Sequence, residues 1–316
     1  MAADLGAEAA LVAAIRTALS RLRADLRLAV PGIAADLEAW QRSLAGSLEP
    51  ADYFTHIKGF PLLRLPWWMY QAALAAGSRP DEAFLDDLLQ STICGYYVIR
   101  MIDNVMDGHA EGEQGLLPAL GLFHSRFQAA YGRWFAPDHP FWRDFHGAWD
   151  RSCQVTIQDG QLTDVTWADF VATSGQKTIA ARIPLAAIAH RYGQQDRFHL
   201  WADWASDFGL WHQLQNDFFD WNKDLRIGTA TYVLSEARRQ AGPNGDVADW
   251  MIHHGLAWAS AKLLPMLDRL AEDAQRLGSD ALCDYIATRR RLLKQDRQDL
   301  DKALKVFGML SAAIKS

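Results

Sequence analysis

The feature that most constrains this chain is a helical period in its hydrophobic residues that runs nearly from end to end. The first example is a row of apolar residues spaced three or four apart: Leu11, Ile15, Leu19, Leu22 and Leu26. That spacing places all of them on one face of an α-helix. Similar periodicity covers further stretches: 80–108, 114–134, 140–160, 195–222, 247–275 and 279–309. Because no stretch alternates as a half-buried strand does, the predicted fold class is all-α.

Helix-breaking residues separate these stretches. They are Pro31-Gly32, Gly77 to Pro80, Ala136 to Asp138, Gly193 and Gly242 to Gly245. Glycine and proline in such places are typical of connections between helices. No linker long enough to divide the chain interrupts the pattern. We therefore expect a single-domain helical bundle over residues 1–316, with about ten to twelve helices, several of them longer than about 20 residues.

The composition is that of a globular protein. Half of the residues are hydrophobic and 22% are charged, and acids outnumber bases 38 to 32, which gives a net charge of −6 at pH 7. A nucleic-acid-binding protein would usually carry a basic stripe, so we expect no nucleic-acid partner. Aromatic residues are abundant, with 13 Trp, 14 Phe and 8 Tyr. These aromatic side chains are numerous enough for a large aromatic core or for an aromatic binding surface.

The sequence carries no pattern typical of export or of membrane insertion. Its first residues include Asp4 and Glu8 before any apolar run, unlike a secretory signal. No run approaches 18 uninterrupted apolar residues, so no membrane span is expected. The three cysteines, Cys94, Cys153 and Cys283, are odd in number and far apart, which fits a reducing compartment. These patterns predict a cytoplasmic protein.

The stretch IRMIDNVMDG, residues 99–108, carries two carboxylates inside an apolar run. Asp103 and Asp107 are four residues apart and project from the same face of a helix. Because two like charges repel there, a cation should offset them, either Arg100 or a hard divalent metal ion. Gly108 follows directly and is typical of a helix end. Taken alone, the pair also fits the solvated end of an amphipathic helix.

A second acidic cluster lies more than 100 residues later, in GLWHQLQNDFFDWNKDLRIG at residues 209–228. Asn216, Asp220 and Asp224 share one stripe of a predicted helix, and Asp217 lies at its edge. Aromatic residues flank the stripe, and acids are costly to bury unpaired among them. Two such helices facing each other would make an oxygen-lined site for Mg²⁺, which usually keeps waters and substrate phosphate oxygens as ligands. A diphosphate is therefore the natural substrate group.

Four basic residues are candidates for binding that diphosphate: Lys177, Arg182, Lys223 and Arg226. Lysine and arginine side chains donate charge-assisted hydrogen bonds to phosphate oxygens. Each of the four also fits an ordinary surface charge. Lys223 and Arg226 are favoured because they lie inside the second acidic cluster.

The ordered pair of acidic motifs resembles the class I isoprenoid synthase superfamily, over roughly residues 60–235. This superfamily includes the trans-isoprenyl diphosphate synthases, the squalene and phytoene synthases and the class I terpene cyclases. The resemblance implies an all-α bundle with a central active-site cavity, where three Mg²⁺ ions bind the substrate diphosphate and remove it to leave an allylic carbocation. It implies that Asp103 and Asp107 bind the metal ions from one wall, and that Asn216, Asp220 and Asp224 bind them from the other, with Asp217 as a substitute for Asn216. Homodimers are common among these relatives.

Features of more than one subfamily are present. The segment YYVIRMIDNVMDG is similar to the first aspartate motif of the squalene and phytoene synthases. The segment around FGLWHQLQNDFFD resembles equally the second motif of those enzymes and that of the chain-elongating synthases. Lys177-Thr178 looks like the Lys-Thr pair upstream of that second motif. Residues 108–115 lack the Arg-Arg pair that binds isopentenyl diphosphate, and the Tyr-Cys-x-x-Val-Ala-Gly helix of the squalene-type enzymes is not found. Positions 220 and 224 hold Asp where microbial terpene cyclases have Ser and Glu.

These features favour a Mg²⁺-dependent terpene synthase that ionises one linear prenyl diphosphate, farnesyl or geranylgeranyl, and cyclises the cation to a hydrocarbon or an alcohol. An aromatic wall would shield and stabilise the cation. The candidates for this wall, which also fit ordinary core packing, are Trp68, Tyr96, Tyr97, Phe208, Trp211 and Phe218. Two other interpretations stay open: a prenyltransferase that elongates or couples chains, and a catalytically degenerate all-α partner subunit.

Overall fold

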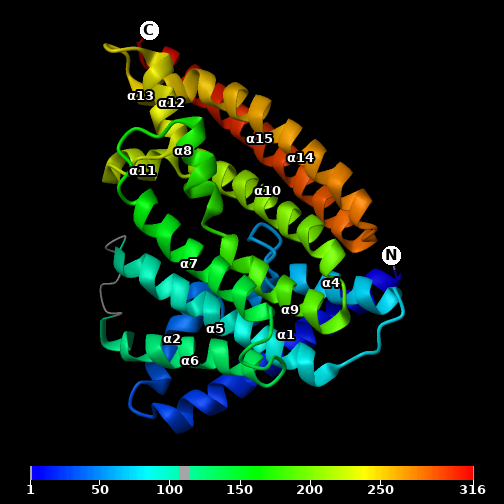
Figure 1. Cartoon of the computed structure of the whole chain (residues 1–316). Coiled ribbons are helices and arrows are strands. Elements are labelled where there is room, and N and C mark those ends of the chain that lie inside the picture. Colours follow the sequence, from blue (N-terminus) through cyan, green and yellow to red (C-terminus); the bar gives the residue numbers. More distant parts are fainter. Residues whose placement is uncertain (1, 107–113, 316) are drawn as a thin grey trace. The chain divides into compact units, whose positions relative to one another are not determined.

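A computed structural model describes residues 2–106 and 114–315, and every regular element in these ranges is helical (Figure 1). The all-α fold class is therefore confirmed. The expected long helices are present: α1 (Ala2–Ala29), α5 (Glu82–Met106), α10 (Gln195–Phe219), α14 (Leu256–Leu277) and α15 (Asp280–Lys315). The α-helices of the described part exceed the twelve expected, because several short ones lie between the long ones. None of the helices in these ranges combines the length and the apolar character that crossing a bilayer requires.

The chain forms two compact units, each built from two stretches of sequence. The first unit comprises Met1–Trp149 and Ala181–Ala202, and the second comprises Asp150–Ala180 and Asp203–Ser316. Helices α7 (Phe141–Asp159) and α10 each begin in the first unit and continue in the second. The interpretation of residues 1–316 as a single domain stays a prediction.

The first unit is organised around α5. Its other elements are α1, α2 (Ala34–Ala45), α3 (Ala51–Thr55), α4 (Arg64–Ala75), η1 (Gln114–Leu116), α6 (Pro118–Gly132), the first part of α7, and α9 (Arg182–Tyr192). Helix α5 packs against α1 and α6. The Ser91 hydroxyl donates to the carbonyl of Phe127 at 2.7 Å, and Gly95 makes room for the Phe127 ring, since a Cβ there would lie 2.9 Å from it. This packing fixes the helix whose last turn carries Asp103.

The second unit contains the remaining elements. They are the last part of α7, α8 (Trp167–Ala172), η2 (Ser174–Gln176), most of η3 (Ile179–Ala181), most of α10, α11 (Trp221–Ile227), α12 (Tyr232–Ala241), α13 (Val247–Trp250), a π-helical turn η4 (Met251–Gly255), α14 and α15. Helices α14 and α15 lie side by side (Figure 1). The indole N–H of Trp204 donates to the carbonyl of Leu270 at 3.0 Å, which ties α10 to α14. The helix of the second acidic motif is thus anchored to this pair.

Candidate functional site

The second acidic motif occupies a break between two helices rather than one uninterrupted helix. Helix α10 ends at Phe219, Asp220 has φ −93° and ψ 1°, and α11 begins at Trp221. Backbone bonds from Asp220 to Asn216 (2.9 Å) and from Asp224 to Asp220 (3.0 Å) bridge the break. The helix predicted over residues 195–222 therefore ends at residue 219. The predicted stripe of Asn216, Asp220 and Asp224 is divided between α10, the break and the separate short helix α11.

Asp217 is the buried member of the motif, with only 6% of its surface exposed. Its Oδ1 accepts a hydrogen bond from the Gln213 side-chain amide at 2.8 Å. Burial raises the pKa of Asp217 to about 7, against the lowering effects of the Gln213 hydrogen bond and the Lys177 charge. The nearby charges of Asp224 and Asp159 raise it further. A buried carboxylate whose charged form is disfavoured in this way is typical of a functional site.

Lys177 lies close enough for its charge to act on this carboxylate, and it pairs with a residue that the sequence did not single out. Its Nζ is 2.5 Å from Oδ2 of Asp159, the last residue of α7. The other oxygen of Asp159 accepts from the Ser174 hydroxyl at 2.5 Å. Asp159 stands 18 residues before Lys177, with no helical or motif relation to it, so only the tertiary fold reveals the pairing. The cluster of Asp159, Lys177, Asp217 and Asp224 is called the Lys177 cluster below.

Two glycines allow the segment carrying Lys177 to lie directly on α10. A Cβ at Gly209 would stand 2.0 Å from the Thr178 hydroxyl oxygen, and one at Gly175 would stand 2.3 Å from the Leu210 side chain and 3.2 Å from the carbonyl oxygen of Phe170. Gly209, Gln213 and Asp217 recur every fourth residue and so share one face of α10. This face receives the Lys177 segment, which brings the charge of Lys177 within electrostatic reach of Asp217.

Replacing Gly209 with Ala is expected to destabilise the fold by about 1–3 kcal/mol, because the added methyl group overpacks the contact with Thr178. Urea unfolding measures the change. Adding Thr178→Ala should restore part of the loss by removing the hydroxyl. Gly147→Ala in α7 is the matched control, because nothing lies within 4 Å of the Cβ position of Gly147. Alanine forms helices better than glycine, so this variant should stabilise the fold by about 0.5–1 kcal/mol. Equal effects at both glycines would contradict the close approach.

The opposite face of α10 is held by a buried arginine. Arg289 of α15 is 2% exposed and donates to Oε1 of Gln215 at 2.8 Å and to the Tyr285 hydroxyl at 3.1 Å. Its guanidinium carbon lies 4.8 Å from the centre of the Trp211 ring and 5.5 Å from that of Phe208. Two residues predicted to form the aromatic wall therefore pack around a cation of the protein itself. Whether either also contacts a substrate stays a prediction.

Of the other predicted residues of the second motif, Asp224 is half-buried and the rest lie at the surface. Asn216 is exposed, and its side-chain nitrogen is 3.4 Å from Nε2 of His212. Asp220 and Lys223 are exposed as well. Exposed Arg226 donates to the carbonyl of Asn222 at 3.2 Å. Among the second-motif carboxylates, Asp217 and not Asp220 is therefore the one most deeply placed beside Lys177.

The first acidic motif is described only in part. Asp103 lies in the last turn of α5 and is half-buried, whereas Asp107 lies outside the described residues. Burial raises the pKa of Tyr96 well above its ordinary value, and the Tyr53 hydroxyl, which forms a hydrogen bond with that of Tyr96, raises it further. Weaker effects of Arg100 and Asp103 place both charges near Tyr96. A tyrosine from the predicted aromatic wall thus lies close to the first motif.

The remaining predicted residues divide between the two units. Trp68 and Tyr97 are buried in the first unit, where Tyr97 packs against Trp40 and Phe123 with ring centres 5.2 and 5.3 Å apart. Phe218 is buried in the second unit. Arg182 begins α9 in the first unit and is half-buried. The roles predicted for these residues stay predictions.

The oxygen donors of the Lys177 cluster suit a small divalent cation. In residues 2–106 and 114–315, no group of three or more His, Cys, Asp and Glu side chains is arranged to hold a metal ion. Mg²⁺ is commonly held by one or two carboxylates, with waters and substrate phosphate oxygens completing its shell. Besides burial, the nearness of Asp224 raises the pKa of Asp217, and a dication between two such carboxylates would relieve that repulsion. These carboxylate oxygens are the donor type that Mg²⁺ prefers, and the binding of Mg²⁺ here stays a prediction.

Comparisons with protein-family models and with curated proteins gave no match to this chain.

Proposed function

We propose that this protein is a Mg²⁺-dependent class I terpene synthase, which removes diphosphate from a linear allylic prenyl diphosphate and cyclises the carbocation. The observation that carries the proposal is the Lys177 cluster, in which a lysine, a buried aspartate and a second aspartate come within electrostatic reach of one another. Lys177 precedes Asp217 by 40 residues, as the lysine of the resembled Lys-Thr pair precedes its motif. The order of the two acidic motifs along the chain supports the same assignment.

The residues of the cluster divide the work of binding a diphosphate. Asp217 and Asp224 would hold Mg²⁺ in the second unit, and Asp103 belongs to the other resembled metal motif. Bound Mg²⁺ supplies electrostatic stabilisation of the charge that develops on the leaving oxygens. Lys177 offers an ammonium group to the phosphate oxygens, and Asp159 orients it beforehand. Asp217 must be ionised to bind Mg²⁺, and a neighbouring cation favours its ionised form.

The fate of the carbocation depends on the walls around the prenyl chain. Aromatic rings stabilise a nearby cation by about 0.5–2 kcal/mol each when they are well placed and desolvated. Tyr96, which lies near Asp103, is the wall candidate with the best support from the structure. Farnesyl and geranylgeranyl diphosphate are the substrates proposed.

Incubation with single substrates tests the proposal. Purified protein is given Mg²⁺ with geranyl, farnesyl or geranylgeranyl diphosphate, one at a time, and the products are analysed by mass spectrometry. We expect a cyclic hydrocarbon or alcohol from one substrate, and none when EDTA replaces Mg²⁺. A longer prenyl diphosphate, formed only when isopentenyl diphosphate is added, would instead identify a chain-elongating enzyme, and a coupled product from two allylic molecules would identify a head-to-head synthase. No product under any of these conditions would favour a non-catalytic partner subunit.

A further inference from the structure

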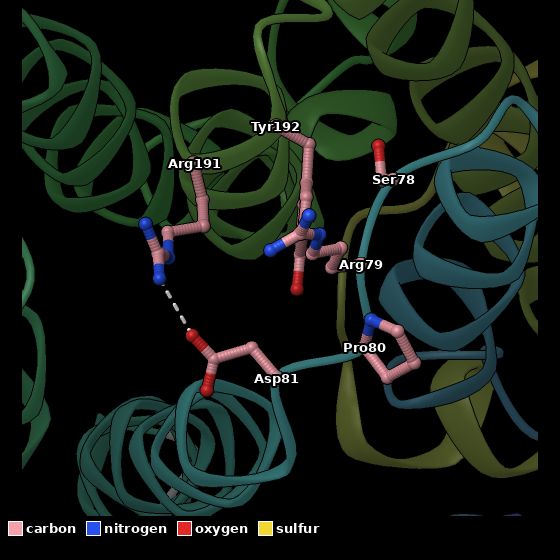
Figure 2. Close-up of a pocket in the computed structure, with 6 residues that line it drawn as sticks. All are labelled: Ser78, Arg79, Pro80, Asp81, Arg191 and Tyr192. Carbon is pink, nitrogen blue, oxygen red and sulfur yellow. Dashed lines mark hydrogen bonds and ion pairs between the residues drawn. The ribbon is translucent and has the colours of Figure 1, made fainter.

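A small pocket lies in the first unit, where the loop between α4 and α5 meets the C-terminal end of α9 (Figure 2). Its volume is about 300 Å³, which is at the lower end of the range for small-molecule sites. The lining residues are Ser78, Arg79, Pro80, Asp81, Arg191 and Tyr192. None of them belongs to either acidic motif or to the Lys177 cluster, so the activity proposed above does not use these side chains.

The carboxylate of the pocket already has its partners. Oδ1 of Asp81 accepts from the backbone N–H of Phe84 at 3.0 Å, and so caps the first turn of α5. Its Oδ2 accepts from the Arg191 guanidinium at 2.6 Å (Figure 2). Although burial works in the opposite direction, these bonds hold the pKa of Asp81 below its ordinary value. Asp81 is thus a built-in anion whose charge Arg191 balances.

Both guanidinium groups of the pocket retain hydrogen-bond donors. The guanidinium carbon of Arg191 lies 5.2 Å from the centre of the Trp134 ring. Arg191 donates one N–H to Asp81, and a guanidinium has five N–H donors in all. Within the described residues, the Arg79 side chain has no hydrogen-bond or ion-pair partner, and in the view of Figure 2 it overlaps Tyr192, to the right of Arg191. Two guanidinium groups with N–H donors available therefore line the same small pocket.

The charges of the pocket leave an excess of one positive charge, that of Arg79, once Arg191 is matched with Asp81. The N-terminus of α5, a helix of 25 residues, adds the positive end of its dipole at Asp81. Several N–H donors in planar forks match the oxygens of a phosphoryl group better than they match a neutral ligand. We propose that this pocket binds the phosphoryl group of a small phosphorylated compound, between Arg79 and Arg191.

Titration with inorganic phosphate, followed by amide NMR of the full chain, tests this binding. We expect shift changes at residues 78–81 and 191–192, with a dissociation constant that rises with salt concentration because the attraction is ionic. Arg79→Gln should weaken binding by about tenfold or more, since it removes a charge-assisted donor. Asp81→Asn should strengthen binding severalfold, because Asn still caps α5 while the charge of Arg191 becomes available to the ligand.

The matched control is Arg143→Gln, an exposed arginine of α7 outside the pocket, which should leave the dissociation constant unchanged. Lys177→Gln should leave the shift changes in the pocket unchanged as well, so that failure of the synthase proposal and failure of this one are separable. The proposal would be overturned by shift changes confined to the Lys177 cluster, or by equal losses in the Arg79 and Arg143 variants. Binding only to phosphatidic-acid vesicles, with none to free phosphate, would also overturn it and would indicate a lipid headgroup site.

Discussion

Replacing Asp217 with Asn is expected to reduce diphosphate release from a prenyl diphosphate by roughly 100- to 1,000-fold, the loss typical when one preorganised electrostatic group is removed. The amide keeps the volume of the side chain and can still accept the hydrogen bond from Gln213, so the local packing survives. What it loses is the negative charge that would hold Mg²⁺ beside Asp224. Steady-state release of inorganic diphosphate measures the effect.

The same substitution is expected to stabilise the metal-free protein, and to do so more at high pH. In the folded state burial raises the pKa of Asp217 to about 7 from an ordinary value of 3.8. Because the folded pKa is the higher one, the stability that protonation confers is fully present below about pH 4 and is lost as the pH rises through 7. Asn stays neutral at every pH, so the free energy of unfolding of the variant exceeds that of the wild type by an amount that grows between about pH 4 and pH 7, towards an upper bound of about 4 kcal/mol.

Urea unfolding in EDTA at pH 5 and pH 8 checks this second effect. The Asp217→Asn variant should exceed the wild type by a larger margin at pH 8 than at pH 5. The control is Asp284→Asn, an exposed aspartate on α15, which should change the free energy of unfolding little at either pH. A variant that is less stable than the wild type by the same amount at both pH values would show that Asp217 is an ordinary structural carboxylate.

Replacing Arg289 with Ala is expected to destabilise the second unit by about 3–5 kcal/mol, because three losses combine. The buried Gln215 oxygen and the Tyr285 hydroxyl lose their donor, a cavity opens between α10 and α15, and the Trp211 ring loses its stacked guanidinium. The stability of Arg289→Lys should lie between that of Arg289→Ala and that of the wild type, since an ammonium group cannot reproduce the planar arrangement of the guanidinium N–H donors. Urea unfolding followed by tryptophan fluorescence measures both variants.

Arg291 provides the matched control for this prediction. It lies two residues further along α15, is exposed, and makes only a 3.5 Å contact with Thr288. Arg291→Ala should therefore change stability by no more than about 0.5 kcal/mol. If Arg289→Ala lowered the free energy of unfolding no more than this control, the buried guanidinium would not be the group that stabilises the packing of α10 against α15.

Helical periodicity was enough to predict the all-α fold and the approximate bounds of the longer helices. The pattern over residues 80–108 became α5, and the glycines and prolines near residues 31, 78, 137, 193 and 243 lie between helices as expected. Periodicity did not predict the break at Asp220, because residues 216 to 224 have the same spacing whether a helix is continuous or kinked. Only the backbone conformation at Asp220 distinguishes the two.

The composition of the candidate site was harder to predict. Motif spacing selected Asn216, Asp217, Asp220 and Asp224 together, but it carried no information on which side chain is buried. Burial depends on the segment at Gly175 and Thr178, which packs against Gly209 from more than 30 residues away in sequence. Asp159 and Arg289 had no motif to mark them, since each acts through contacts that only the tertiary fold creates.

The release of inorganic diphosphate from farnesyl and geranylgeranyl diphosphate is the measurement that tests the central claim most directly. It is compared between the wild type, Asp217→Asn and Lys177→Gln, with Asp284→Asn as the control and with Mg²⁺ or EDTA present. We expect release by the wild type and by the control in Mg²⁺ alone, and a loss of roughly 100-fold or more in the other two variants. Release that persists in both cluster variants, or no release from either substrate by the wild type, would contradict the proposal that the Lys177 cluster ionises a prenyl diphosphate.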